Sequence, residues 1–78
     1  MQTHGDELWD PASGRFHRAR LLWEMALRLW TADDLAREVG VSRTTAYKVI
    51  AGEGVLSRTA YKILLAFERC KRILSDLL

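Results

Sequence analysis

The fold is decided by residues 31–50, whose sequence is TADDLAREVGVSRTTAYKVI. Thr31 can cap the amino end of a helix. Asp34, three residues later, completes a capping box, because its carboxylate can reach back to the backbone amide of the cap residue. The sequence therefore predicts a short helix over residues 32–39.

A second helix follows after a very short turn. Gly40 can adopt the left-handed backbone conformation that ends a helix, and Ser42 can cap another helix that runs to about Ile50. Two short helices joined by a tight turn that contains glycine form a helix-turn-helix unit. The close approach of the two helices requires a small side chain, which Ala36 supplies. The apolar residues placed to fill the space between the helices are Leu35, Val39, Val41, Ala46 and Val49.

This spacing of small residues, glycine and apolar residues resembles the lambda-repressor-like (Cro/repressor, xenobiotic-response-element) family of bacterial and phage regulators. The resemblance covers about residues 20–67. A first helix leads directly into the Thr-capped helix, and a loop with Gly52 follows before Ser57, which can cap the last helix. The resemblance implies a DNA-binding protein whose recognition helix is 42–50. Family members usually have a short fifth helix after a glycine break, whereas here the pattern continues from Ser57 to Leu77.

The resemblance also assigns the candidate contacts with double-stranded DNA. The positions that usually read base edges are Arg43, Thr44 and Lys48. The positions suited to backbone phosphates are Ser42, Thr45, Tyr47 and Arg58, together with the amino end of the first short helix at Thr31. Arginine suits guanine because its fork donates to O6 and N7 together. The alternative interpretation is a helical scaffold on which these side chains are merely solvated.

Charge supports a nucleic-acid partner only through its distribution. The chain of 78 residues has a formal charge of +2. Residues 42–62 contain four bases and only one acid, Glu53, whereas residues 1–11 contain three acids and no base. Positive charge therefore gathers around the second helix of the unit, as expected of a surface that faces phosphates.

The rest of the chain predicts an all-α bundle of four to five helices with a long C-terminal helix and no strand. Residues 1–14 are expected to form a flexible N-terminal arm, and residues 15–78 the DNA-binding domain. The first helix is expected over 15–30, with a wide apolar face, and the last from Ser57 nearly to Leu78. The core face expected of the first helix consists of Phe16, Ala19, Trp23, Ala26 and Trp30, and it is widened by Leu21, Leu22, Met25 and Leu29.

The last helix suggests a homodimer. Its apolar stripe consists of Ala60, Ile63, Phe67, Cys70, Leu74 and Leu77. The first half of this stripe is expected to pack within the domain, whereas the part beyond Cys70 would remain uncovered in a monomer. We expect a homodimer that binds a near-palindromic operator, with the C-terminal helix as its interface and the first helix as a second candidate surface.

These features favour a cytoplasmic transcriptional regulator, most simply a repressor. An antitoxin-type autorepressor with a toxin partner and a helical protein-protein adaptor are the alternatives. We expect no enzyme, no catalytic residues, no cofactor and no metal site, because no nucleophile with a base, ligand cluster or phosphate loop is recognisable. The single cysteine, Cys70, excludes an internal disulfide, and no apolar run is long enough for a membrane span.

Overall fold

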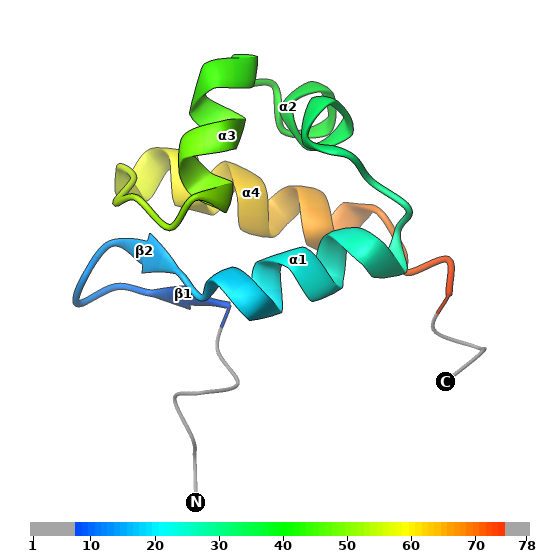
Figure 1. Cartoon of the computed structure of the whole chain (residues 1–78), viewed down its shortest axis with the longest axis horizontal. Helices are drawn as coiled ribbons and strands as arrows, with labels where there is room; N and C mark the ends of the chain where they lie inside the picture. Colours follow the sequence, from blue (N-terminus) through cyan, green and yellow to red (C-terminus); the bar gives the residue numbers. More distant parts are fainter. Residues whose placement is uncertain (1–7, 75–78) are drawn as a thin grey trace, which may run out of the picture.

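The computed structural model describes residues 8–74 and shows four helices and a small hairpin (Figure 1). The helices are α1 (Arg18–Leu27), α2 (Ala32–Val39), α3 (Arg43–Ile50) and α4 (Ser57–Arg69). The strands are β1 (Trp9–Asp10) and β2 (Arg15–Phe16). The expected helical bundle is thus confirmed in its main part, but the fold is not purely helical.

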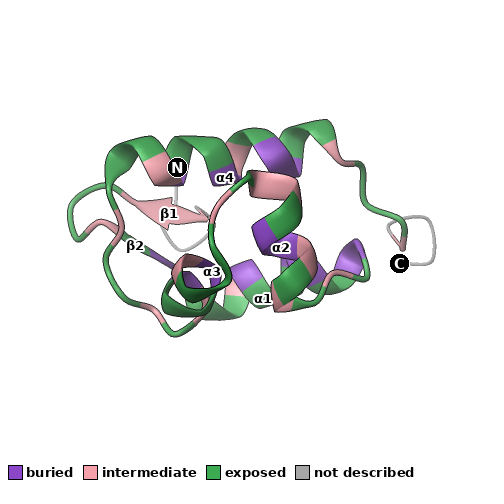
Figure 2. Ribbon diagram, turned by 90° about the horizontal axis from the view of Figure 1, so that it is seen from above, coloured by how far each residue is buried: buried purple, intermediate pink, exposed green. Residues whose placement is uncertain are grey.

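The helices form two levels. The long helices α1 and α4 run along opposite sides of the domain, and α2 and α3 lie across the same face of this pair (Figures 1 and 2). Every helix contributes to one apolar core, which also contains Phe16 from the hairpin. The core residues that are almost completely buried and largest are Leu21, Leu35, Val49 and Ile63. Because α2 and α3 share this core, the orientation of α3 is fixed by the whole domain.

Local sequence signals set the ends of α2 and α3 as predicted. The Thr31 amide donates to Asp34 Oδ2 over 2.8 Å, and the Asp34 amide donates to Thr31 Oγ1 over 3.2 Å, which completes the capping box. Ser42 Oγ accepts from the Thr45 amide over 3.1 Å and starts α3. Gly40 has a φ of 85°, a left-handed conformation that glycine adopts at little cost.

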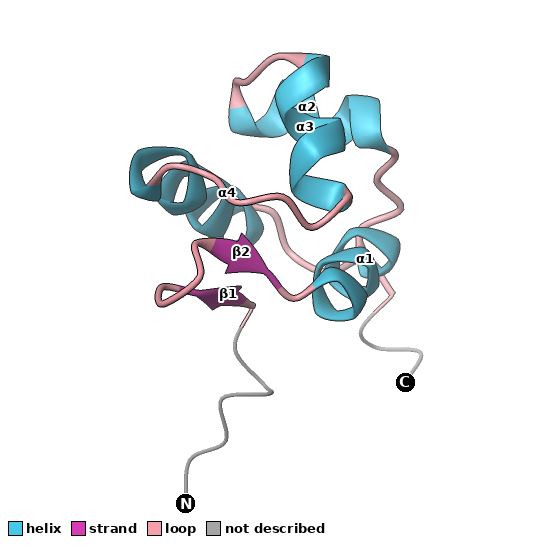
Figure 3. Cartoon of the chain, turned by 60° about the vertical axis from the view of Figure 1, so that its left-hand side comes forward, coloured by secondary structure: helices cyan, strands magenta, loops and turns pink. Residues whose placement is uncertain are grey.

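Residues 8–14, expected to belong to a flexible arm, contain a strand and a turn, and residues 1–7 lie outside the described part of the chain. Trp9 pairs with Phe16 in an antiparallel hairpin. The carboxylate of Asp10 accepts hydrogen bonds from the Ala12 amide and the Ser13 hydroxyl, which closes the turn. The Gly14 carbonyl then accepts from the Val55 amide over 2.8 Å. The hairpin therefore lies against the loop between α3 and α4 (Figure 3).

The first helix is shorter than predicted, and its buried face differs. It is expected over 15–30 but spans Arg18–Leu27, because residues 15–16 belong to β2 and the chain turns at Leu29, whose φ is 60°. The buried side chains of α1 and its C-cap are Leu21, Glu24, Met25, Leu27 and Arg28. Of the residues expected on this face, Phe16, Leu21 and Met25 are buried, and Trp30 stacks on Phe67. The others, Ala19, Leu22, Trp23, Ala26 and Leu29, are exposed.

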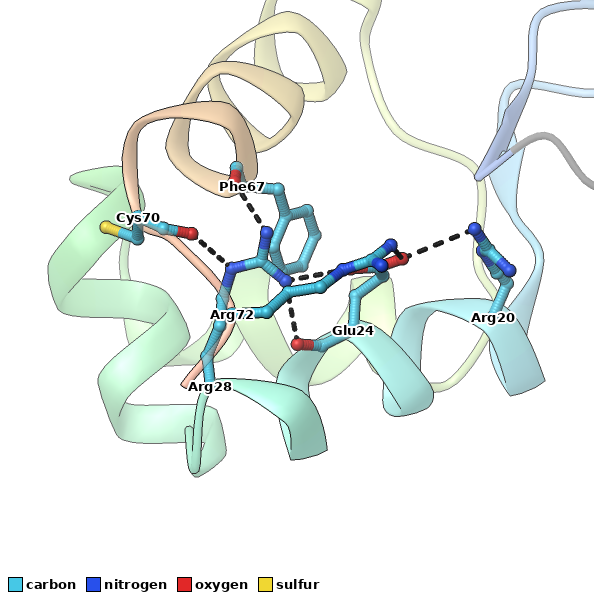
Figure 4. A network of polar contacts seen from close by, with 6 residues as sticks. All are labelled: Arg20, Glu24, Arg28, Phe67, Cys70 and Arg72. Carbon is cyan, nitrogen blue, oxygen red and sulfur yellow. Dashed lines mark hydrogen bonds and ion pairs between the residues drawn. The ribbon is translucent and has the colours of Figure 1, made fainter. Parts of the chain in front are cut away.

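The C-terminal helix is also shorter than predicted, because α4 ends at Arg69. The Arg28 guanidinium donates to the carbonyl of Phe67 and to that of Cys70, both over 2.6 Å (Figure 4). The amides of the next turn, at Ile73 and at Leu74, both donate to the Leu27 carbonyl. The chain therefore turns back onto the end of α1 instead of continuing as a helix.

The start of α4 and the apolar stripe differ from expectation in smaller ways. Leu56 occupies the N-cap position without a side-chain cap, and Ser57 is the first helical residue. The first half of the stripe packs within the domain, as predicted: Ala60, Ile63 and Phe67 are buried. Leu77 lies outside the described residues. None of the helices in residues 8–74 has the length and apolar character needed to cross a membrane.

Candidate nucleic-acid interface

One face of α3 is polar and open to solvent. Arg43, Thr44, Tyr47 and Lys48 are all exposed, and the first two lie three to five positions before the last two, which places the four on one side of the helix. The opposite face packs into the core. No residue of α3 carries a negative charge. The helix therefore presents cationic, hydroxyl and aromatic groups together from a rigid base.

The packing of α2 against α3 fixes this face. Leu35, Ala36 and Ala46 are buried between the two helices and the rest of the core, as the sequence predicts. Val39 and Val41 are half-buried and pack against the same core. The carboxyl ends of both helices are also capped from elsewhere in the domain. Arg18 Nε donates to the Ile50 carbonyl over 3.0 Å, and Arg69 Nη2 donates to the Glu38 carbonyl over 2.8 Å.

The hydroxyl groups expected to meet phosphates already have partners. Ser42 Oγ accepts from the Thr45 amide and donates to Thr45 Oγ1 over 3.0 Å. Thr31 Oγ1 donates to Asp34 Oδ2 over 3.0 Å and accepts from the Asp34 amide. Thus Ser42 and Thr31 shape the helix ends, and Thr45 keeps only its own hydroxyl proton for an outside acceptor.

The amino end of α2 carries carboxylates where an anion was expected to bind. The hydrogen bond from the Thr31 amide, together with the contacts from Arg37 and the Thr31 hydroxyl, holds the pKa of Asp34 below its ordinary value. Asp34 therefore remains ionised and occupies the site that a phosphate would take. Asp33 adds a second carboxylate beside it. This end of α2 disfavours a phosphate close to Thr31.

Arg43 has a partner that sequence reasoning missed. Its Nε lies 2.9 Å from Oδ1 of Asp33, so an ion pair joins the first turn of α3 to the first turn of α2. Both side chains are exposed, at 70% for Arg43 and 55% for Asp33. The pairing spans ten positions of sequence across the turn, and no helical spacing would have indicated it.

Lys48 lies at a shallow groove. This groove has a volume of about 200 Å³ and is lined by Thr45, Lys48, Gly54, Val55, Leu56 and Thr59. It lies between α3, the following loop and the first turn of α4, which also contains the exposed Arg58. Within residues 8–74, neither Lys48 nor Arg58 forms an ion pair. The structure thus brings two predicted cations to neighbouring elements with their charges uncompensated.

Comparison of the chain with models of protein families, with curated proteins and with solved structures found no match. The described residues contain no group of three or more histidine, cysteine, aspartate or glutamate side chains arranged to hold a metal ion. The interpretation of the site therefore depends on its own geometry.

Proposed function

We propose that this protein is a sequence-specific, double-stranded-DNA-binding transcriptional regulator that inserts α3 into the major groove. The observation that carries the proposal is the exposed face of α3, where Arg43, Thr44, Tyr47 and Lys48 project from a helix that contains no acid and is fixed against α2. The major groove is wide enough to admit an α-helix, and each base pair presents a distinct pattern of donors and acceptors there.

The side chains on the exposed face of α3 and beside it are suited to different contacts with DNA. Arg43, at the start of α3, can donate two hydrogen bonds to a guanine, and Thr44 offers both a hydroxyl and a methyl group to a base edge. Lys48 and Arg58, which lack ion-pair partners in the described part of the chain, are suited to base or phosphate oxygens beside the groove. A protein bound in this way represses by occupying a site that polymerase needs.

A homodimer remains part of the proposal, although its expected interface changes. The helix that should have formed the seam ends at Arg69. Exposed apolar side chains occur on α4, at Tyr61 and Leu65, and also on α1 and next to its carboxyl end, at Leu22, Trp23, Leu29 and Ile73, with Trp23 48% and Ile73 62% exposed. The Ile73 amide donates to the Leu27 carbonyl, so this residue adjoins the end of α1. A second copy covering this surface would supply two recognition helices for a near-palindromic operator.

The first test is selection from a random duplex pool, with fluorescence anisotropy on the retained sequences at several salt concentrations. Arg43→Ala and Lys48→Ala should each abolish part of the enriched motif, whereas Lys71→Ala, an exposed cation beyond α4, should not. Affinity should fall as salt rises, because bound cations displace counterions from the phosphates. No enrichment by the native chain would contradict the proposal.

The exposed apolar residues also favour a second candidate, a protein-binding adaptor or an antitoxin that holds a toxin through α1. Trp23→Glu separates these ideas from the homodimer. In sedimentation at tens of micromolar, the native chain should be dimeric and Trp23→Glu monomeric. A native chain that stays monomeric with and without DNA would remove the homodimer and leave a different protein as the partner of this surface.

A further inference from the structure

The pair formed by Asp33 and Arg43 is a connection between the two helices of the unit, not a contact within one helix. Asp33 is the second residue of α2, and Arg43 is the first residue of α3. Each is adjacent in sequence to a residue that is held by a cap: Asp34 belongs to the capping box, and Ser42 caps α3. The backbone positions of both partners are therefore well fixed, and the ion pair brings the Arg43 guanidinium next to the Asp33 carboxylate.

The ion pair with Asp33 leaves the Nη groups of the Arg43 guanidinium available for a base. An arginine carries five N–H donors in a rigid fork, one on Nε and two on each Nη. Asp33 lies against Nε, 2.9 Å away. Within residues 8–74, neither Nη group forms a hydrogen bond or an ion pair, and the edge that these groups form is the one that can donate side by side to O6 and N7 of guanine.

We propose that Asp33 is a positioning residue that holds Arg43 in place to contact one guanine in each half-site of the DNA. This inference rests on the proposed function, and it adds a residue on α2 that sets the specificity of α3. The carboxylate restrains the guanidinium before binding, so less rotamer freedom is lost when the base contact forms. Its negative charge also repels phosphates, so Arg43 is held back from non-specific contacts with the backbone.

Removing the charge of Asp33 should raise the affinity for arbitrary DNA and lower the preference for guanine. The two effects can therefore be measured separately. Asp33→Asn keeps the shape of the side chain and removes its charge. The variant should bind arbitrary duplexes a few-fold more tightly, because one repulsive charge is gone. Its preference for guanine at the position read by Arg43 should fall by up to roughly 5-fold, which is the upper limit for one solvent-exposed ion pair.

Glu53→Gln is the matched control. Glu53 is an exposed acid in the loop after α3, and it forms no ion pair within residues 8–74. This change should also raise the affinity for arbitrary duplexes, but it should leave the guanine preference intact. The comparison therefore separates loss of negative charge near the DNA from loss of the restraint on Arg43.

The experiment is selection from the random duplex pool with the native chain, Asp33→Asn, Glu53→Gln and Arg43→Ala. Dissociation constants are then measured by anisotropy for the selected duplex and for duplexes with each other base at the guanine. Native enrichment in which Arg43→Ala erases a guanine and Asp33→Asn weakens the same guanine supports the inference. If Arg43→Ala erases that guanine and Asp33→Asn leaves it at full strength, the inference fails and the proposed function stands. If the native chain enriches no motif, both fail.

Discussion

Replacing Arg28 by methionine should lower the free energy of unfolding more than a substitution of an exposed residue does. The guanidinium is only 6% exposed and donates four hydrogen bonds, which reach the carbonyl oxygens of Glu24, Phe67 and Cys70 and the Glu24 carboxylate (Figure 4). Methionine fills a similar volume but leaves these acceptors unsatisfied. Removing one partner from a buried ion pair costs about 3–5 kcal/mol. Glu24 keeps its contacts with Arg72, so we expect the lower end of this range, about 3 kcal/mol.

The assay is urea unfolding followed by far-ultraviolet circular dichroism, with thermal unfolding beside it. A loss of about 3 kcal/mol is a large part of the about 5–15 kcal/mol typical of a folded domain, and it should lower Tm by at least about 12 °C. Arg28→Lys should fall between the native chain and Arg28→Met, because an ammonium group keeps the charge but cannot reach all the acceptors that the planar fork reaches.

Arg20→Met is the matched control within the same network. Arg20 lies 3.4 Å from the Glu24 carboxylate and its side chain is 39% exposed, so its removal should cost less than about 1 kcal/mol. Equal, small losses for Arg28→Met and Arg20→Met would refute the conclusion that Arg28 holds the end of α4 against α1.

Three further predictions concern the ends of helices and pH. Leu29→Gly should stabilise the fold by roughly 0.5–1 kcal/mol, measured by urea unfolding, because φ at this position is 60° and the side chain is 62% exposed; Leu29→Ala should give no such gain. Gly40→Ala should cost about 1–2 kcal/mol in the same assay, through backbone strain alone, since nothing lies within 4 Å of the added methyl group. Burial alone would raise the pKa of Glu24, but hydrogen bonds from Arg72 and Arg28 outweigh it and hold the pKa below its ordinary value of 4.5. The stability that Glu24 contributes is therefore present above about pH 4.5 and is lost as the pH falls through its folded-state pKa, and Glu24→Gln should flatten the fall in unfolding free energy below about pH 4.5.

The helix-turn-helix unit could be predicted from sequence because its signals are local. The caps at Thr31 and Ser42 each bond to a residue three positions away, and the left-handed turn at Gly40 needs nothing beyond its own backbone. Such signals act in any surrounding structure, so the sequence-derived bounds of α2 and α3 agree with the structure. The exposed face of α3 follows from the same helical period.

The ends of α1 and α4 could not be predicted, because contacts between distant residues set them. No glycine or proline follows Gly54, so the apolar stripe of α4 has no local stop signal. The helix α4 ends where Arg28 donates to the Cys70 carbonyl, and Arg28 lies 42 positions before Cys70 in the sequence. An arginine inside an apolar helix pattern is ordinarily assigned to the surface. The hairpin was missed for a related reason, since strands of two residues are too short to show alternation.

Charge is the feature that the sequence describes least well. A count of residues treats all twelve lysines and arginines as candidates for an anionic partner. The structure uses Arg18, Arg28 and Arg69 to cap the carboxyl ends of other helices, and it pairs Arg43 with Asp33. Of the four bases in residues 42–62, Lys48, Arg58 and Lys62 are left without an ion pair among the described residues. If the proposed function is correct, these cations attract DNA of any sequence, and contacts to base edges must supply the specificity. Enrichment of a motif is therefore the informative measurement, and retention of arbitrary DNA is not.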